Sequence, residues 1–578
     1  MEAVAVSYAV PAWHNINGLD MKTSIIHTPK KSASEYIEIN ENGVVGNATA
    51  VHDGPVYICL AENYDYWCAE LGVDRSEWDW CHWGENITFR CTDKRLTEFD
   101  FRLGDIWKVG SRVRLQVCGS RIPCMKLAWR CGQKDSWLKG LSESGRVGVY
   151  LRVLRGGRIY PGDRAVQESC SEDVDVATIT RLAFDADLKT RDTLDLLANH
   201  KTLLGLNRLI LGRKLASMDD KTNLGRNAWK GWRDLRVSRI VDEGNGIKSF
   251  YLVPTDGQKL AWYQPGQFLT VRLPLLTGDV RSWSISGWPG RKQPEYYRLS
   301  IKQAAKASAW MCNECTTGTI LSARSPAGRF FLDWTQPVSP RQIYLSAGIG
   351  ITPILAMMKA HASHPNMSKT PGIWIHVARD GENLQLHDEF LKTENNPTKR
   401  FVFMTQPRDV DIVGKDYDFA GRPNLETITS LIGSTYQMSP LGTTEMTLPA
   451  KFSAVYICGP SDFEKDMRNI LQEFAIPPRF IHSEKFSASE QVVGDLKRAM
   501  VRFIKSNKVA EWERKKPMTL LELAESVGLT PDYGCRVGAC GSCATKLNCG
   551  SVSGGVQMDG SVLTCSATPA SGEVDVEL

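Results

Sequence analysis

Residues 342–362, "QIYLSAGIGITPILAMMKAHA", pass from an apolar strand through a glycine turn into an apolar helix. Gly348 and Gly350 stand at the turn, where glycine lets the backbone approach a pyrophosphate closely. The helix that follows offers free N–H groups and a positive dipole end to an anion. The stretch therefore predicts a strand–turn–helix unit that binds a nucleotide, although it is not the G-x-G-x-x-G fingerprint.

The neighbouring sequence repeats this alternation of strands and helices. Apolar runs "GIWIHVAR", "RFVFMT" and "AVYICGP" follow at intervals up to about residue 486. The last run ends in a second turn, formed by Cys458, Gly459 and Pro460. Strands that alternate with helical stretches are typical of a parallel α/β sheet, so a nucleotide domain is expected here.

The composition describes an ordinary globular protein of several domains. A chain of 578 residues suggests about three to five domains. The formal net charge of +5 is spread along the chain, which argues against nucleic acid or a membrane surface as partner. The sequence has no run of eighteen apolar residues and no evident targeting signal. Sixteen mostly scattered cysteines fit a reducing compartment, so a cytoplasmic location is expected.

The pattern of apolar residues and glycines in the rest of the chain predicts a multidomain protein of the α+β and α/β classes. Short apolar runs between glycine turns favour strands near the N-terminus and again after residue 230, whereas leucines at helical spacing follow residue 170. The predicted parts are a β-rich domain (1–168), a helical unit (169–225), an antiparallel barrel (226–336), the nucleotide domain (337–486), a polar linker (487–514) and a last module (515–578).

The barrel contains "RSWSISG", residues 281–287, which places an arginine, an aromatic ring and a hydroxyl together. Arg281 suits a phosphate, and the hydroxyl of Ser284 suits a flavin ring nitrogen. With "PGQF", "SPAGRFFL", "SAGIGITP", "YICGP" and "SEKF", this order closely resembles the ferredoxin-NADP reductase superfamily over residues 230–486. Trp283 stands where that family usually has tyrosine.

The resemblance implies a flavin barrel, a nicotinamide domain and hydride transfer to flavin N5. It implies that Thr352 and Cys458 lie near the nicotinamide, and that Glu484 and Phe486 lie near the flavin. Among the matched residues, Cys458 and Ser284 are the catalytic candidates. Arg281, Trp283, Ser284, Gly348, Gly350, Thr352, Gly459, Glu484 and Phe486 are the cofactor-binding candidates.

The sequence leaves open the choice between NADH and NADPH and the choice between FMN and FAD. Arg379 and Asp380 follow one strand, and an arginine favours NADPH whereas a carboxylate favours NADH. The order of reductase then ferredoxin resembles phthalate dioxygenase reductases, which carry FMN. The "SWSIS" and "SPAGRFF" stretches look more like the FAD barrels of flavohaemoglobins.

Near the C-terminus, Cys535, Cys540 and Cys543 form C-x4-C-x2-C, and Cys565 follows after 21 residues. This is the plant-type [2Fe–2S] spacing, and the glycines between the thiols let the backbone wrap a cluster. Zinc usually takes two separated C-x-x-C pairs, and a redox disulfide needs neither the third nor the fourth cysteine. Residues 515–578 resemble a β-grasp ferredoxin domain.

The N-terminal part carries "AENYDYWCAELG", "GENIT", "SRIPCMKL" and "SGRVGVYLRVLRGGRIYPGD". These stretches resemble a MOSC domain (molybdenum cofactor sulfurase C-terminal domain), a β-barrel, and the helical unit resembles the three-helix appendage of some bacterial members. The family binds molybdopterin and includes enzymes that reduce N-hydroxylated bases. The resemblance puts Cys124 at the molybdenum-ligating position. A thiolate is a suitable soft ligand for molybdenum.

Other residues of this part bear on the same cofactor. Arg121 and Lys126 flank the thiol and could meet a pterin phosphate or lower the thiol pKa. The family's "HGG…AVY" stretch appears here as "VHDGPVYICL", which keeps His52 but has Asp53 in place of a glycine. The pterin pocket is therefore expected to differ from that of the family.

Together these features predict an NAD(P)H-dependent flavin and iron–sulfur oxidoreductase. Electrons would pass through flavin (FMN or FAD) and the [2Fe–2S] cluster to a molybdenum cofactor at Cys124, which reduces a small N-oxygenated substrate. Two alternatives remain. The chain could serve a separate oxygenase as electron-transfer reductase, with the MOSC domain for docking, or Cys124 could carry sulfur as a persulfide.

Overall fold

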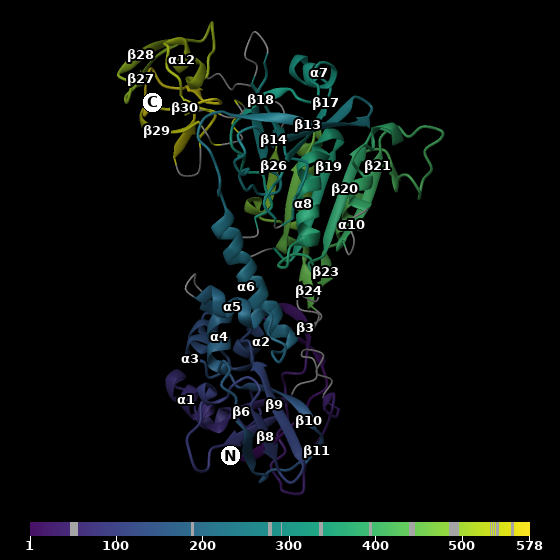
Figure 1. Ribbon diagram of the computed structural model, residues 1–578, viewed down its shortest axis with the longest axis vertical. Coiled ribbons are helices and arrows are strands. Elements are labelled where there is room, and N and C mark those ends of the chain that lie inside the picture. The colour runs from purple at the N-terminus through teal and green to yellow at the C-terminus, as the bar shows by residue number, and fades with distance from the viewer. Residues whose placement is uncertain are drawn as a thin grey trace. The chain divides into compact units, whose positions relative to one another are not determined.

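The computed structural model describes residues 1–46, 56–185, 190–274, 280–290, 292–333, 339–391, 396–438, 446–484, 496–531, 533, 536, 538, 541, 543–556 and 560–578. The chain forms two compact units (Figure 1). The first comprises Met1–Lys221 with Thr435–Pro449, and the second comprises Thr222–Ser434 with Ala450–Leu578. No helix in these described ranges is long and apolar enough to cross a membrane.

The first unit is built on a mostly antiparallel seven-stranded sheet. Its strands, in spatial order, are β1 (Glu2–Val6), β7 (Ile87–Arg90), β6 (Val56–Leu60), β10 (Val149–Arg155), β9 (Val113–Ser120), β8 (Ile106–Val109) and β12 (Ala165–Ser169). A three-stranded sheet of β11 (Gly157–Ile159), β4 (Ile37–Asn40) and β5 (Gly43–Val44) shares its core. Helices α1 (Ala61–Leu71), α2 (Met125–Arg130) and α3 (Trp137–Ser144) pack around a second, tryptophan-rich cluster.

The predicted helical unit consists of three helices, α4 (Val176–Asp185), α5 (Arg191–Ala198) and α6 (Gly205–Asn223). Leucines at three- and four-residue spacing supply its small core.

One hairpin of this unit comes from the sequence predicted as nucleotide domain. Strands β23 (Thr435–Met438) and β24 (Met446–Pro449) join β2 (Ala12–Ile16) and β3 (Leu19–Thr23) in a four-stranded sheet. Met446 pairs with Met21 across β24 and β3. Because an edge strand such as β3 has unpaired backbone groups, it can accept a further strand from a distant part of the chain. The prediction that residues 337–486 form a single domain was therefore wrong at this hairpin.

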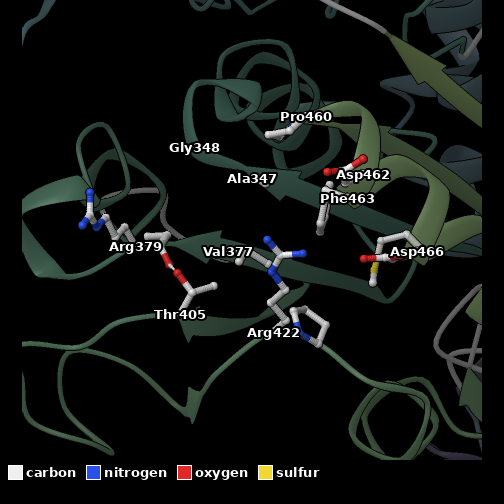
Figure 2. Close-up of a pocket in the computed structure, with 13 residues that line it drawn as sticks. Ala347, Gly348, Val377, Arg379, Thr405, Arg422, Pro460, Asp462, Phe463 and Asp466 are labelled. Atoms are coloured by element: carbon white, nitrogen blue, oxygen red, sulfur yellow. Dashed lines mark hydrogen bonds between the residues drawn. The ribbon is translucent and has the colours of Figure 1, made fainter.

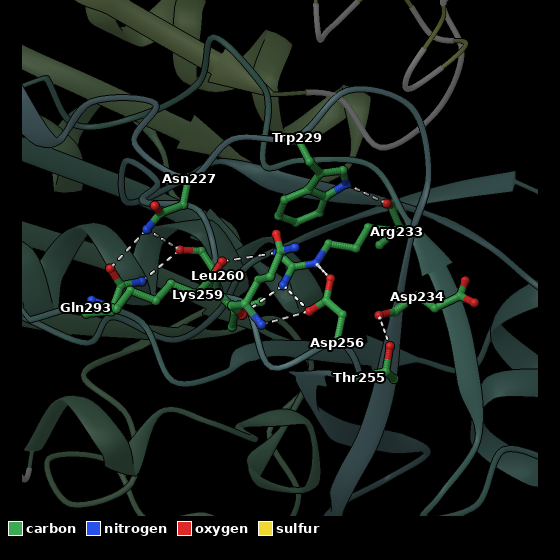
Figure 3. Close-up of polar contacts among 11 residues, drawn as sticks. Asn227, Trp229, Arg233, Asp234, Thr255, Asp256, Lys259, Leu260 and Gln293 are labelled. Carbon is green, nitrogen blue, oxygen red and sulfur yellow. Dashed lines mark hydrogen bonds and ion pairs between the residues drawn. The ribbon is translucent and has the colours of Figure 1, made fainter.

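The second unit begins with the predicted antiparallel barrel. Its six antiparallel strands are β16 (Val280–Ser284), β15 (Phe268–Arg272), β18 (Ile320–Ala323), β13 (Arg233–Gly244), β14 (Ile247–Pro254) and β17 (Tyr297–Lys302), and α7 (Lys306–Asn313) packs on β17. A bridge between Ile285 and Leu299 joins the two end strands. Arg233 clamps the loop that follows β14, with Nη2 donating to Asp256 Oδ1 at 2.6 Å and to the Gln258 carbonyl at 2.8 Å (Figure 3).

The nucleotide domain is a parallel sheet between helices, as its sequence predicts. The strand order is β22 (Phe419–Ala420), β21 (Thr398–Met404), β20 (Gly372–Ala378), β19 (Arg341–Ala347), β25 (Ser453–Cys458) and β26 (Ile481–Glu484). Helix α8 (Ile351–Ser363) packs on β19 and β25, and α9 (Asp388–Leu391), α10 (Leu425–Ile432) and α11 (Ser461–Leu471) complete the domain (Figure 1).

The C-terminal module is a five-stranded sheet covered by α12 (Leu520–Ser526). Its strands are β28 (Lys508–Glu513), β27 (Arg498–Phe503), β33 (Glu573–Val576), β29 (Ala544–Cys549) and β31 (Ser561–Leu563), with a small ribbon of β30 (Val552–Ser553) and β32 (Thr568–Pro569). The predicted linker at 487–514 was therefore wrong where β27 and β28 lie. One face of each strand is solvated and carries charged side chains such as Arg498, Arg502 and Glu511, so the segment resembles a linker in its sequence.

A partly buried ion triad joins the barrel to the nucleotide domain within this unit. Arg298 of β17 donates to Glu389 at 2.6 Å, and Lys359 of α8 donates to the other carboxylate oxygen at 2.5 Å. Burial alone would raise the pKa of Glu389, but hydrogen bonds and charge from Arg298 and then Lys359 hold the pKa below its usual value. The triad therefore stabilises the fold above about pH 4.3, and this contribution is lost as the pH falls through the lowered pKa.

Replacement of Glu389 by alanine is expected to lower the free energy of unfolding by roughly 3 kcal/mol, because it leaves two partly buried cations without their partner. Thermal unfolding of the holoprotein measures this loss. Glu382→Ala is the matched control, since Glu382 pairs with Arg408 but its side chain is 71% exposed, and it should cost no more than about 0.5 kcal/mol. Equal losses in both variants would contradict a special role of the triad.

Candidate functional site

The nucleotide domain has a topological switch point between β19 and β25. The chain moves from β19 outward to β22 and then returns to β25 on the other side of β19. In open α/β sheets, ligands bind at the carboxyl ends of the strands where the order reverses. Gly348 follows β19 and Gly459 follows β25, so both predicted turns meet at this crevice.

The glycines of this crevice are required by close backbone contacts. A Cβ on Gly350 would lie 2.2 Å from the carbonyl oxygen of Cys458, and one on Gly459 would lie 2.9 Å from the Cβ of Ala347. Gly348 has a φ of +51° and faces open space, with nothing within 4 Å of the position of its absent Cβ. The two turns therefore pack against each other and leave a bare backbone surface, which fits the phosphates of a dinucleotide.

A cavity of about 240 Å³ extends from Gly348 across the strand ends (Figure 2). Its walls carry two arginines, Arg379 after β20 and Arg422 after β22, and the hydroxyl of Thr405. Asp462 and Asp466 of α11 line another part of the wall. Ala347, Val377, Ala378, Pro423, Pro460, Phe463 and Met467 complete the lining. Sequence reasoning missed Arg422 and Thr405, because neither belongs to a recognisable motif.

Arg379 and Asp380, which the sequence left as alternatives, have different surroundings. Arg379 lines the cavity, and its Nε donates to Gln406 Oε1 at 3.0 Å. Asp380 does not line it, and its Oδ1 accepts a hydrogen bond from Asn383 at 2.8 Å. The cationic member of the pair is therefore the one that lines the cavity.

Three predicted residues that are far apart in sequence meet where the barrel adjoins the nucleotide sheet. Ser284 Oγ of β16 donates to Glu484 Oε2 at 3.2 Å, and Glu484 is the strand partner of Cys458. Burial, and then the carboxylates of Glu484 and Glu464, raise the pKa of the fully buried Cys458 thiol well above its usual value. Cys458 is therefore a neutral thiol at this junction.

The other flavin and nicotinamide candidates occupy the same region of the fold. Thr352 is buried at the start of α8, and its Oγ1 donates to the Ile349 carbonyl at 3.0 Å. Arg281 and Trp283 lie on β16 with Ser284, and Trp283 packs against the barrel core. Phe486 lies outside the described residues.

In the C-terminal module, Cys543 and Cys565 are buried in one apolar cluster, against which Tyr533 packs. The N–H of Gly538 donates to Cys565 Sγ at 3.2 Å, which fits a thiolate that ligates a cluster. Arg536, Gly538 and Gly541 have positive φ values of 58°, 76° and 75°, which wrap the backbone around this point. Cys535 and Cys540 lie outside the described residues.

In the first unit, Cys124 is partly exposed directly before α2. Burial alone would raise the pKa of its thiol, but Lys126, Arg121 and the N–H groups of Leu127 and Lys126 hold the pKa below its usual value. The Arg121 guanidinium is itself anchored, because Nη1 donates to the Trp83 carbonyl at 2.5 Å. A partly exposed thiol whose pKa is lowered by two nearby cations fits a soft metal and an anionic pterin.

His27 is a residue of this region that sequence reasoning missed, because no motif surrounds it. It is 6% exposed, and among the described residues its Nδ1 has no hydrogen-bond partner. Burial lowers its pKa to about 4, with the charges of Arg121 and Arg130 adding to the effect, so the ring is neutral. The indole N–H of buried Trp83 likewise has no hydrogen-bond partner among the described atoms. His52 lies outside the described residues.

Three domain families match the chain. They are the MOSC domain over residues 45–166, the oxidoreductase NAD-binding domain over residues 344–469 and the 2Fe-2S iron-sulfur cluster binding domain over residues 504–570. The three domain resemblances drawn from the sequence are thereby confirmed, in the predicted order. The match from residue 504 also covers part of the predicted linker.

Curated proteins with similar sequence include flavohemoproteins. That of Deinococcus radiodurans is 30% identical over 270 residues, which are 45% of this chain and 61% of that protein. That of Bacillus cereus is 30% identical over 286 residues, 47% of this chain and 65% of that protein. The chain therefore spans less than two thirds of the length of these relatives.

Among solved structures, phthalate dioxygenase reductase is described as a modular structure for electron transfer from pyridine nucleotides to [2Fe-2S]. It is 22% identical, with a TM-score of 0.40, and the match covers 60% of this chain and 98% of that one. A type IV self-sufficient cytochrome P450 monooxygenase is 16% identical, with a TM-score of 0.46, over 75% of this chain and 47% of that one.

Proposed function

We propose that this chain, an NAD(P)H-dependent flavin and iron–sulfur oxidoreductase with a MOSC domain, reduces small N-hydroxylated compounds. The overall reaction is R–NHOH + NAD(P)H + H⁺ → R–NH₂ + H₂O + NAD(P)⁺. The N–O bond breaks, its oxygen leaves as water, and the nicotinamide supplies the electron pair. The NAD-binding and 2Fe-2S domains, which carry electrons, lie in one chain with the MOSC domain, which would use them. The electron transfer is therefore intramolecular.

Each cofactor has residues suited to hold it. The crevice glycines and the cavity suit the dinucleotide, β16 with Glu484 suits the flavin, and the four-cysteine loop suits the cluster. Cys124, with Arg121 and Lys126, suits a molybdenum–pterin group. When bound, these groups supply electron transfer from the nicotinamide to the N–O bond.

The observation that carries the terminal step is the state of Cys124. Most other cysteine thiols of the MOSC part with a shifted pKa, such as Cys59, Cys81 and Cys131, are buried and have their pKa raised. Cys124, by contrast, has its pKa lowered, and it is partly exposed. A partly exposed sulfur whose thiol pKa is lowered by neighbouring cations is suited to metal ligation.

Metal and flavin analysis of the purified protein, combined with two activity assays, tests this function. We expect molybdenum bound in about equimolar amount, and NAD(P)H oxidation driven both by an N-hydroxylated base and by cytochrome c. Protein without molybdenum that still reduces cytochrome c would contradict the terminal step and favour a reductase for a separate oxygenase. Sulfur that cyanide releases from Cys124 as thiocyanate, without molybdenum, would favour the persulfide carrier.

The cavity further supports a preference for NADPH. Arg379, Arg422 and Thr405 form a cationic, hydrogen-bonding wall suited to a ribose phosphate, because a guanidinium can bind phosphate oxygens in pairs. Arg422→Ala is therefore expected to lower kcat/KM for NADPH about tenfold, which is about 1.4 kcal/mol, and to change that for NADH less than about twofold. Steady-state reduction of ferricyanide measures both values.

Lys451→Ala is the matched control for this prediction. Lys451 is an exposed cation that precedes β25, at the end of the sheet opposite to the cavity. Its loss should leave the ratio of the two kcat/KM values unchanged. If Arg422→Ala also leaves that ratio unchanged, the proposed phosphate contact is wrong.

A further inference from the structure

Five side chains form a continuous stack of cations and aromatic rings in the second unit. The Arg272 guanidinium lies 4.0 Å from the centre of the Trp232 ring, and that of Arg324 lies 5.0 Å from the same ring. Arg324 also lies 5.3 Å from the ring of Tyr533, and Arg536 lies 4.0 Å from it. We call Arg272, Trp232, Arg324, Tyr533 and Arg536 the arginine–aromatic stack.

The stack connects two domains. Trp232 precedes β13, Arg272 ends β15 and Arg324 follows β18, so these three belong to the flavin barrel. Tyr533 and Arg536 belong to the cysteine loop of the C-terminal module. Arg324 therefore lies between a ring of the barrel and a ring of the cysteine loop.

The loop end of the stack lies against two predicted cluster ligands. Tyr533 packs in one apolar cluster with Cys543 and Cys565. The Arg536 side chain is fixed by an ion pair between its guanidinium and Glu525 of α12. Displacement of the Tyr533 ring would thus disturb the packing directly around these thiols.

A second contact fixes the same loop from another side. The position of a Cβ on Gly541 lies 3.2 Å from Arg329 Nε and 3.3 Å from Arg329 Nη2. Arg329 belongs to the barrel segment "SPAGRFFL", and Gly541 lies between Cys540 and Cys543. The guanidinium thus lies directly over the backbone of the loop, where no side chain intervenes.

We propose that the arginine–aromatic stack, with the Arg329 contact, is the docking surface that holds the cysteine loop against the flavin barrel. Its residues act as positioning residues for electron transfer from flavin to cluster. Cation–π contacts suit this task, since they hold two surfaces in register without a buried, unpaired charge. Electron transfer is sensitive to small displacements of its two centres, so loss of the stack should slow it. This inference rests on the proposed electron route.

Tyr533→Leu and Tyr533→Phe in the full-length holoprotein test the proposal. Tyr533→Leu removes the ring, whereas Tyr533→Phe keeps it for the two arginines. In stopped-flow experiments with NADPH, we expect the rate of flavin reduction to stay within about twofold in both. The rate of cluster reduction should fall about tenfold or more in Tyr533→Leu and be restored in Tyr533→Phe.

A second measurement does not depend on turnover. Amide hydrogen exchange across residues 536–545 should become faster in Tyr533→Leu, because the loop loses its contact with the barrel. The matched control is Tyr251→Leu, since Arg239 lies 3.7 Å from the Tyr251 ring within the barrel alone. This control should change neither loop exchange nor cluster reduction.

The possible outcomes separate this inference from the proposed function. Wild-type protein whose cluster takes no electrons from flavin would overturn the electron route and the inference together. Cluster reduction in Tyr533→Leu as fast as in Tyr251→Leu would overturn the docking surface alone. If Tyr533→Leu assembles no cluster by electron paramagnetic resonance, Trp232→Leu takes its place from the barrel side. An unchanged rate in Trp232→Leu would then overturn the proposal.

Discussion

Replacement of Cys124 by serine is expected to abolish reduction of an N-hydroxylated base, with a loss of about 100-fold or more. A hydroxyl neither ionises at neutral pH nor offers the soft sulfur that molybdenum prefers. In the native protein, Arg121 and Lys126 favour the thiolate. The measurements are NAD(P)H oxidation driven by the base and the molybdenum content of the purified variant.

The same variant should keep its NAD(P)H–ferricyanide and cytochrome c activities, since Cys124 lies in the MOSC domain and outside the flavin and cluster modules. Cys170→Ser is the matched control, because Cys170 is an exposed cysteine just after β12 and is expected to change nothing. Full base reduction by Cys124→Ser would show that this thiol is not the terminal ligand.

Replacement of Gly350 by alanine is expected to lower the rate of flavin reduction by NADPH about 100-fold. The new Cβ would lie 2.2 Å from the Cys458 carbonyl oxygen and 2.9 Å from the Gly459 nitrogen. Both atoms are backbone, so the two turns must separate, and overpacking of this kind costs about 1–3 kcal/mol or more. The crevice for the pyrophosphate would open, and stopped-flow flavin reduction measures the consequence.

Gly212→Ala is the matched control for this prediction. Gly212 lies in α6, and the nearest atom to its added Cβ, the Cβ of Ala198, is 4.0 Å away. Alanine at this helical position should be neutral or stabilise by up to about 1 kcal/mol. Flavin reduction in Gly350→Ala at the rate of Gly212→Ala would mean that the crevice does not bind the coenzyme.

The sequence was a good guide where the relevant signal is local. The glycine turn at Gly348 and Gly350 lies between a strand and a helix, as the pattern of apolar residues predicts. The C-x4-C-x2-C spacing led to the 2Fe-2S domain, which the family match confirms. The predicted linker at 487–514 was wrong although the signal for a strand is local there. Ala499, Val501 and Phe503 are buried and alternate with exposed residues on β27, which is the period of a half-buried strand.

Other features depend on contacts between distant segments. The hairpin β23–β24 pairs with β3 although more than 400 residues separate them in sequence. Ser284 meets Glu484 across 200 positions. The pairing of β24 with β3 leaves no periodic or motif-like trace, because it needs only ordinary residues that the fold brings together. Ser284 and Glu484 each belong to a stretch that the family resemblance places near the flavin, but only the structure shows their direct contact.

By itself, the sequence determined which modules the chain contains and in which order, since turns, ligand spacings and strand periods are set by neighbouring residues. Only the tertiary structure decided that Arg379 rather than Asp380 faces the cavity, and that Arg422 joins it. It also decided that Arg324 lies between Trp232 and Tyr533. The physical reason is that the cavity walls and the docking surface come from the order of strands and the packing of domains, which no short stretch of sequence encodes.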